Sequence, residues 1–228
     1  MDNKHVIIQI IGEGKTESGR DRSDLQSPVS GVLRIIISKL CGNPIDLEII
    51  FKPFHSLQQG GLDRKAQFAR RQAYYSKYSG VVLVVDTDGD HPHKIEALKK
   101  GRDSCQIQLP MAVGVAHPCI ESWLLADAKA IHKALDLPEC PNVPDKPEEL
   151  PAPREDRAIN PKTELGKCTN SKRELSVKEM SSIAAKIRDF KILRERCPKS
   201  FAPFADEVES RIKPLCETDD SNPGTIQL

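Results

Sequence analysis

Residues 80–90, with the sequence G-V-V-L-V-V-D-T-D-G-D, constrain the fold of this chain more than any other segment. Five consecutive Val and Leu residues, 81–85, lack the alternation of a half-buried strand. An apolar run this short is typical of a strand buried on both faces of a parallel sheet. Asp86 and Asp88 follow two residues apart, so an extended chain projects both carboxylates from one face. The sequence therefore predicts a buried strand with an acidic carboxyl end.

Carboxylates gathered this closely favour a bound cation. Two like charges about 4 Å apart repel by roughly 4 kcal/mol at an effective dielectric constant near 20. Oxygen ligands alone suit a hard cation, Mg²⁺ or Mn²⁺. A solvated acidic turn is the alternative, and the pattern D-x-D-G-D does not by itself separate the two.

A second apolar run, residues 5–11, is predicted to form the first strand and leads into G-E-G-K-T-E. Two glycines flank Glu13, so the backbone can turn sharply and leave this carboxylate at the carboxyl edge of the sheet. Ligands of open parallel sheets bind at that edge. We expect Glu13 to meet Asp86 and Asp88 if their strands lie side by side.

The same glycines do not complete a nucleotide-binding motif. The phosphate loop G-x-x-x-x-G-K-[ST] requires glycine at the position of Gln9, and the dinucleotide fingerprint requires glycine at the position of Glu17. Nucleotide binding at this segment is therefore disfavoured.

Strand-like and helix-like segments alternate through the first half of the chain. This order predicts an α/β fold with a mainly parallel sheet of about four strands, flanked by helices. Helices are expected over residues 28–40, 62–78 and 94–101, and further strands over residues 45–53 and 109–116.

Residues 117–127, H-P-C-I-E-S-W-L-L-A-D, directly follow the fourth predicted strand. Pro118 suits the first turn of a helix, which would bring Glu121 near the carboxyl edge. Glu121 has two interpretations, a catalytic group or a carboxylate that interacts with the helix dipole. Trp123 is expected to anchor the core.

Four regions are predicted along the chain. Residues 1–136 form the α/β core, and a Pro-rich segment, 137–170, forms an ordered loop or a mobile lid. Residues 171–216 carry helical periodicity and are expected to form a C-terminal lobe on the core, and residues 217–228 a flexible tail.

Composition narrows the possible partners. The net charge is +1, from 34 basic and 33 acidic residues, so no global basic field indicates nucleic acid. Seven Cys without a C-x-x-C pair argue against a structural zinc site and predict reduced thiols in a cytoplasmic protein. No apolar run approaches the roughly 20 residues that cross a bilayer, so we expect no membrane partner.

Three segments taken in order, G-E-G-K-T-E, V-V-D-T-D-G-D and H-P-C-I-E-S-W-L-L-A-D, resemble the Toprim superfamily. The resemblance is closest to small stand-alone Toprim-like proteins of bacterial defence loci, the RloB-like group, and to the Toprim nuclease domain of the OLD family. It spans about half the chain.

The resemblance implies a set of site residues. Glu13 becomes a metal ligand or general acid/base, and Asp86 and Asp88 become ligands of the same Mg²⁺ or Mn²⁺. Many of those relatives carry Asp at the position of Glu17. Glu17, Glu121 and Lys162 are the candidates that complete a two-metal site in the OLD-like nucleases.

Three functions follow from these observations. The first is metal-dependent cleavage of phosphodiester bonds in DNA or RNA during anti-phage defence. The second is a non-catalytic Toprim-like subunit that binds nucleic acid or an ATPase encoded nearby. The third, a haloacid-dehalogenase-type phosphatase, fits poorly because its nucleophile follows the first strand. The sequence does not specify an oligomeric state.

Overall fold

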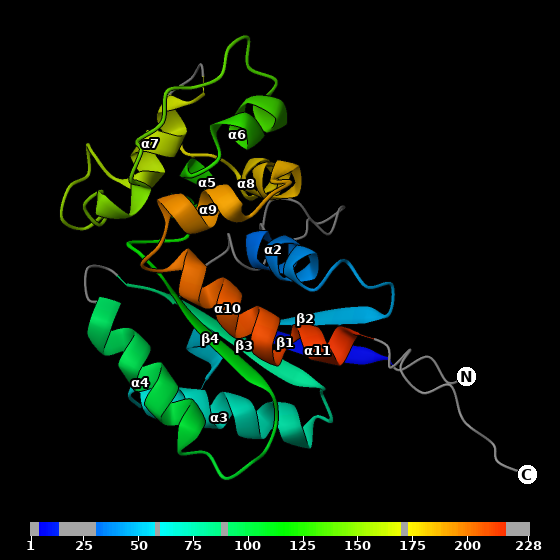
Figure 1. Cartoon of the computed structure of the whole chain (residues 1–228). Coiled ribbons are helices and arrows are strands. Elements are labelled where there is room, and N and C mark those ends of the chain that lie inside the picture. Colours follow the sequence, from blue (N-terminus) through cyan, green and yellow to red (C-terminus); the bar gives the residue numbers. More distant parts are fainter. Residues whose placement is uncertain (1–4, 14–30, 58–59, 88–90, 170–172, 218–228) are drawn as a thin grey trace, which may run out of the picture.

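The structure, a computed structural model, describes residues 5–13, 31–57, 60–87, 91–169 and 173–217. It has an α/β fold with a parallel sheet flanked by helices and a helical C-terminal region (Figure 1). The predicted fold class is confirmed at this level.

The four strands are parallel and lie in the order β2-β1-β3-β4. Ile11 in β1 lies opposite Leu83 in β3, and Asp86 in β3 lies opposite Ala116 in β4. The carboxyl ends of β1, β3 and β4 therefore meet at one edge. The strands are β1 (Val6–Gly12), β2 (Leu47–Pro53), β3 (Gly80–Asp86) and β4 (Met111–Ala116).

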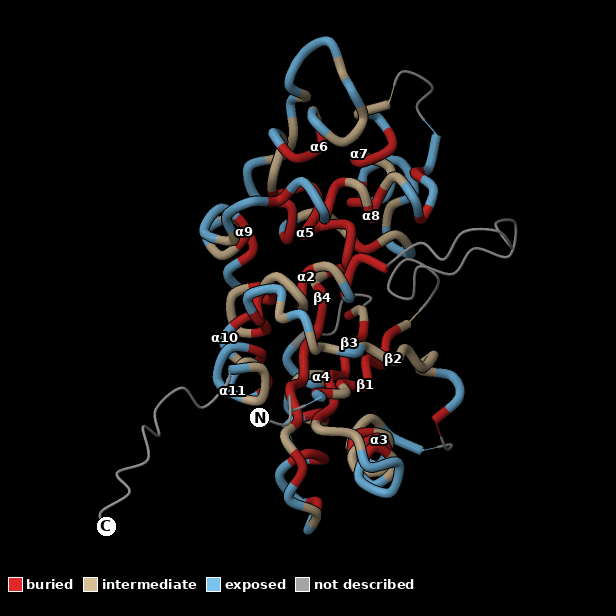
Figure 2. Tube along the Cα trace, turned by 90° about the vertical axis from the view of Figure 1, so that its right-hand side faces the viewer, coloured by how far each residue is buried: buried red, intermediate tan, exposed pale blue. Residues whose placement is uncertain are grey.

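Strand β3 is buried on both faces, as its unbroken apolar run predicted. Val82 and Val84 belong to one core, and Leu83 and Val85 belong to the other. Figure 2 shows this buried centre of the sheet in red. By contrast, β2 is half-buried at the edge of the sheet.

Helices cover both faces of the sheet (Figure 1). Helices α3 (Leu62–Tyr75) and α4 (His91–Asp103) pack on one face, and α2 (Val32–Leu40) and α10 (Phe201–Arg211) on the other. Helix α3 ends three residues before its predicted end, since Lys77, just beyond it, has a left-handed φ of 59°. Helix α4 begins three residues earlier than predicted.

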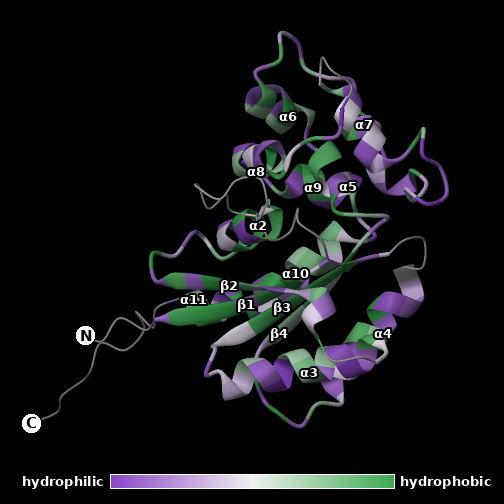
Figure 3. Cartoon of the chain, turned by 180° about the vertical axis from the view of Figure 1, so that it is seen from behind, coloured by the Kyte–Doolittle hydropathy of each residue, from purple (hydrophilic) through white to green (hydrophobic). Residues whose placement is uncertain are grey.

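A group of short helices lies on the side of α2 and α10 that faces away from the sheet (Figures 1 and 3). Helix α6 packs on α8, and α5 packs on α7. α11 (Lys213–Cys216) follows α10. The group comprises α5 (Glu121–Leu125), α6 (Ala128–Leu135), α7 (Pro161–Lys167), α8 (Val177–Lys186) and α9 (Lys191–Arg196).

Contacts join the predicted C-terminal lobe to the predicted core. Helix α8 of the lobe packs on α6 of the core, and α10 of the lobe packs directly on β4. The boundaries at residues 136, 170 and 216 remain predictions.

Trp123 anchors the junction between the sheet and the short helices. Its side chain is fully buried, and its indole ring stacks on Phe204 with the ring centroids 5.1 Å apart. A Cβ atom at Gly114 in β4 would lie 2.5 Å from the Phe204 ring, so this close approach of α10 requires glycine. The core role expected for Trp123 is confirmed.

Between Leu137 and Asn160, the Pro-rich segment forms no strand and no α-helix. Its one regular element is the short 3₁₀ turn η2 (Pro147–Glu149). Glu148 in this turn is 3% exposed. Its carboxylate accepts hydrogen bonds from the backbone N–H groups of Lys199 and Ser200, each at 2.8 Å, and from the Ser200 hydroxyl. Burial raises the pKa of Glu148, although these hydrogen bonds act in the opposite direction. Glu148 thereby fastens the segment to the start of α10.

All seven cysteines carry free thiols, as the scattered sequence positions suggested. Among the residues that the structure describes, no helix combines the length and apolar character needed to span a bilayer.

Candidate functional site

Glu13 and Asp86 lie at the same edge of the sheet. Glu13 follows β1 and Asp86 ends β3, and these two strands are hydrogen-bonded neighbours. If the register that pairs Ile11 with Leu83 continues for two residues, Glu13 is level with Val85. Both carboxylate residues are half-buried. The expectation that these two strands lie side by side is confirmed.

Asp86 connects β3 to the start of α5. Its Oδ1 accepts a hydrogen bond from the backbone N–H of Ile120 at 3.2 Å. Its backbone carbonyl accepts a second from Lys94 Nζ at 2.8 Å. The carboxylate is therefore oriented toward the loop that follows β4 and ends directly before Glu121, the first residue of α5.

That loop differs from the prediction. The His117–Pro118 peptide bond is cis, and α5 begins at Glu121, after an N-cap at Ile120. The expectation that Pro118 occupies the first turn of the helix is wrong. Pro118 lies before the helix because the loop first passes Thr87, which directly follows β3. The Thr87 hydroxyl donates a hydrogen bond to the Pro118 carbonyl oxygen there.

Thr87 and His117 were missed by the sequence analysis. Thr87 is fully buried, and its Oγ1 lies 2.9 Å from His117 Nδ1 and 3.2 Å from the Pro118 carbonyl oxygen. The hydroxyl has one hydrogen, which it donates to the carbonyl, so both contacts are hydrogen bonds only if His117 Nδ1–H donates to Oγ1. The one sequence signal was the position of His117 directly after a buried strand.

Among the described residues at this edge, Glu121 is the charged group with an unpartnered oxygen. It is 5% exposed, and its Oε2 has no hydrogen-bond partner in the described part of the chain. Oε1 lies 3.9 Å from Lys162 Nζ. A buried carboxylate oxygen without a donor costs free energy, which a ligand bound at this edge would offset.

The thiol of Cys119 shows that these charges are close together. Burial raises the pKa of Cys119, and the negative charges of Glu121 and Asp86 raise it further. The positive charge of Lys162 acts in the opposite direction. Side chains from β3, α5 and α7 therefore lie within electrostatic reach of one sulfur atom.

The local sequence of α7 explains the position of Lys162. Asn160 caps this helix, and its Oδ1 accepts hydrogen bonds from the backbone N–H groups of Lys162 at 3.0 Å and Thr163 at 3.1 Å. Pro161 occupies the first turn, where its missing N–H costs nothing. The sequence N-P-K-T therefore starts a helix with Lys162 directed to Glu121.

Two of the predicted site residues, Glu17 and Asp88, lie outside the described residues. Within the described ranges, no group of three or more His, Cys, Asp and Glu side chains is arranged to hold a metal ion. Glu13 and Asp86 supply oxygen donors at the edge, and Glu121 adds a buried carboxylate oxygen without a partner. This donor chemistry fits a hard divalent cation.

Comparisons with family models, with curated proteins and with solved structures found no match for this chain. The Toprim resemblance therefore depends on the three sequence motifs.

Proposed function

We propose that this protein is a Mg²⁺-dependent nuclease of the Toprim type, which hydrolyses phosphodiester bonds of DNA or RNA in anti-phage defence. The observation that carries the proposal is Glu121, a buried carboxylate with one oxygen unpartnered in the described chain, beside Asp86 and Lys162. Mg²⁺ or Mn²⁺ would be held by Glu13, Asp86 and Asp88.

The bound cation would supply Lewis acidity to the phosphoryl oxygen. The protein residues have separate tasks. Asp86, oriented by the Ile120 N–H group, fixes the position of the negative charge that holds the cation. Lys162, with Nζ 3.9 Å from the Glu121 carboxylate, offsets negative charge that develops on the phosphoryl group.

Glu121 accepts a proton from the attacking water in this scheme. Together with Glu17, it would also hold a second divalent cation that activates this water. A water oxygen attacks phosphorus, the bond from phosphorus to the leaving oxygen breaks, and one proton passes from the water to Glu121. The leaving oxygen takes a proton from solvent.

Replacing Asp86 with Asn tests the proposal. The amide oxygen of Asn can still accept the Ile120 N–H hydrogen bond, so the loop is kept while the charge is lost. We expect cleavage of single- and double-stranded DNA and RNA to fall at least about 100-fold, which corresponds to about 2.7 kcal/mol of transition-state stabilisation. Asp145→Asn, at a fully exposed carboxylate, is the control. Equal cleavage by the wild type and Asp86→Asn would contradict the proposal.

The second candidate is a non-catalytic Toprim-like subunit that binds nucleic acid or an ATPase encoded nearby. The near-neutral net charge of +1 favours it. Size-exclusion chromatography with the neighbouring gene product shows whether a complex forms. A cleavage assay without that product then separates the candidates, because a nuclease turns over alone and a subunit does not.

A further inference from the structure

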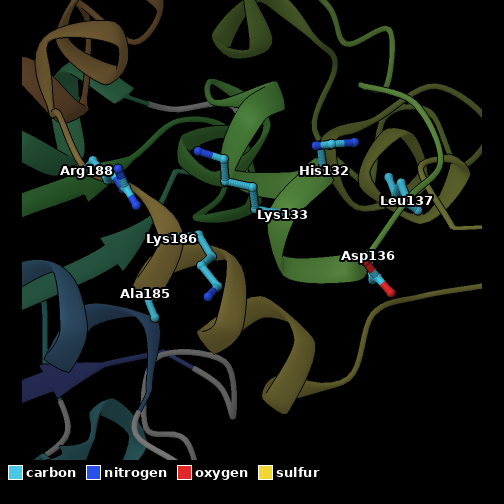
Figure 4. Close-up of a pocket in the computed structure, with 7 residues that line it drawn as sticks. All are labelled: His132, Lys133, Asp136, Leu137, Ala185, Lys186 and Arg188. Carbon is cyan, nitrogen blue, oxygen red and sulfur yellow. The ribbon is translucent and has the colours of Figure 1, made fainter.

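An open cavity of about 540 Å³ lies between α6 and α8, and its walls are charged (Figure 4). His132 and Lys133 come from α6, Lys186 ends α8, and Arg188 follows it. None of these residues belongs to the candidate active site. We call this cavity the basic pocket.

The basic pocket carries an excess of positive charge. Lys133, Lys186 and Arg188 have no carboxylate within 4 Å in the described part of the chain. Asp136 is the one acidic residue in the lining, and its carboxylate points away from the three basic side chains in Figure 4. Three unneutralised cations on one surface are a ready site for an anion.

The ends of the two helices do not account for these cations. Basic residues often compensate the negative end of a helix dipole. At α8 this is done by Lys39 from α2, whose Nζ donates to the carbonyl groups of Ala184 at 3.1 Å and Ala185 at 2.7 Å. At α6 the His132 carbonyl accepts the backbone N–H of Leu137 at 3.2 Å. The basic side chains of the pocket are therefore not needed to cap either helix.

The lining also indicates how a ligand is recognised. Leu137 and Ala185 are its apolar members, and it contains no Phe, Tyr or Trp on which a base would stack. Recognition here depends on charge, which suits a phosphate group better than a nucleobase.

We propose that the basic pocket binds backbone phosphates of a nucleic acid. The inference rests on the proposed function for its choice of nucleic acid as the anion, and it adds a contact surface separate from the carboxylates. Lys and Arg neutralise phosphates whatever the base sequence, so the pocket contributes affinity without sequence preference.

The test is the salt dependence of binding in EDTA, where the metal site plays no part. A fluorescent single-stranded DNA of mixed sequence is titrated with wild type and with the triple variant Lys133→Gln, Lys186→Gln, Arg188→Gln. Each lost phosphate contact lowers the magnitude of the slope of log K against log salt by about 0.7 on a single strand. We expect this magnitude to fall by about 2 and binding near 50 mM salt to weaken. The control replaces three exposed basic residues of the opposite layer, Arg71, Lys77 and Lys100, with Gln.

An equal slope for the wild type and the triple variant would overturn the inference, as would an equal loss in the control. Inorganic tripolyphosphate is titrated in parallel. If it binds through the pocket while the oligonucleotide does not, the ligand is a free polyphosphate and the backbone assignment is wrong. Should the triple variant fail to fold, the three single variants replace it, each with an expected loss of about 0.7. The nuclease proposal fails separately, through absent metal-dependent cleavage by the wild type.

Discussion

Glu121 and Glu148 are two buried carboxylates at the starts of helices, and they differ in one respect. Glu148 is 3% exposed and Glu121 is 5% exposed. The carboxylate of Glu148 receives three hydrogen bonds from Lys199 and Ser200. In the described part of the chain, Oε2 of Glu121 receives none.

The difference separates a structural carboxylate from a candidate functional one. Burying a carboxylate costs free energy, and hydrogen-bond donors offset this cost. At Glu148 these donors are groups of Lys199 and Ser200. At Glu121 the described fold offers the Cys119 thiol and a lysine 3.9 Å away, and Oε2 has no hydrogen-bond partner. A ligand that binds at this edge would complete the environment of Glu121.

The largest expected effect on stability is at Glu148. Glu148→Ala leaves the buried N–H group of Ser200 and the part-buried N–H group of Lys199 without an acceptor, so the free energy of unfolding should fall by about 3 kcal/mol. Urea denaturation measures the change. The matched control is Glu149→Ala, which removes an exposed carboxylate from the next residue. A loss of unfolding free energy no larger than that of the control would contradict the structural role assigned to Glu148.

Glu121→Gln should have a smaller effect on stability, with the unfolding free energy changing by less than about 1 kcal/mol, because no described hydrogen bond of Oε2 is lost. Its effect on function should be large. We expect Mn²⁺ to raise the melting temperature of the wild type and of Glu148→Gln more than that of Glu121→Gln. A Glu121→Gln protein that unfolds easily yet responds fully to Mn²⁺ would reverse the roles assigned to the two carboxylates.

A third helix-start carboxylate, Glu179, should show the smallest effect. It forms a capping box with Ser176, and the hydrogen bond from Arg173 lowers its pKa from 4.5 to about 2. Because the folded pKa lies below the unfolded one, the stabilisation is present above about pH 5 and is lost as the pH falls toward 2. The difference in unfolding free energy between wild type and Glu179→Gln, followed by urea denaturation, should shrink over this range. A difference that stays constant would show that the charge of Glu179 contributes nothing.

The sheet and its acidic edge were predictable from local patterns. An unbroken apolar run marks β3 as buried on both faces, and alternation of strands with helices implies parallel neighbours. These two rules bring Glu13 and Asp86 to one edge before any coordinate is known.

The rest depends on contacts between distant segments. The hydrogen bond from Ile120 to Asp86 spans 34 residues, and the cap of α8 by Lys39 spans about 145. Neither hydrogen bond can be inferred from a short stretch of sequence. The proximity of Lys162 to Glu121 was anticipated through the family resemblance alone, and the basic pocket had no sequence signal because its residues come from two separate helices.

A crystal structure of the protein soaked in Mn²⁺, with anomalous data collected, would show directly whether the carboxyl edge of the sheet binds a cation. We expect a peak at this edge, with carboxylate oxygens of Glu13 and Asp86 about 2.0–2.2 Å away, as in compact octahedral sites. A crystal that diffracts well and shows no peak at this edge, or a peak bound by other residues, would contradict this expectation.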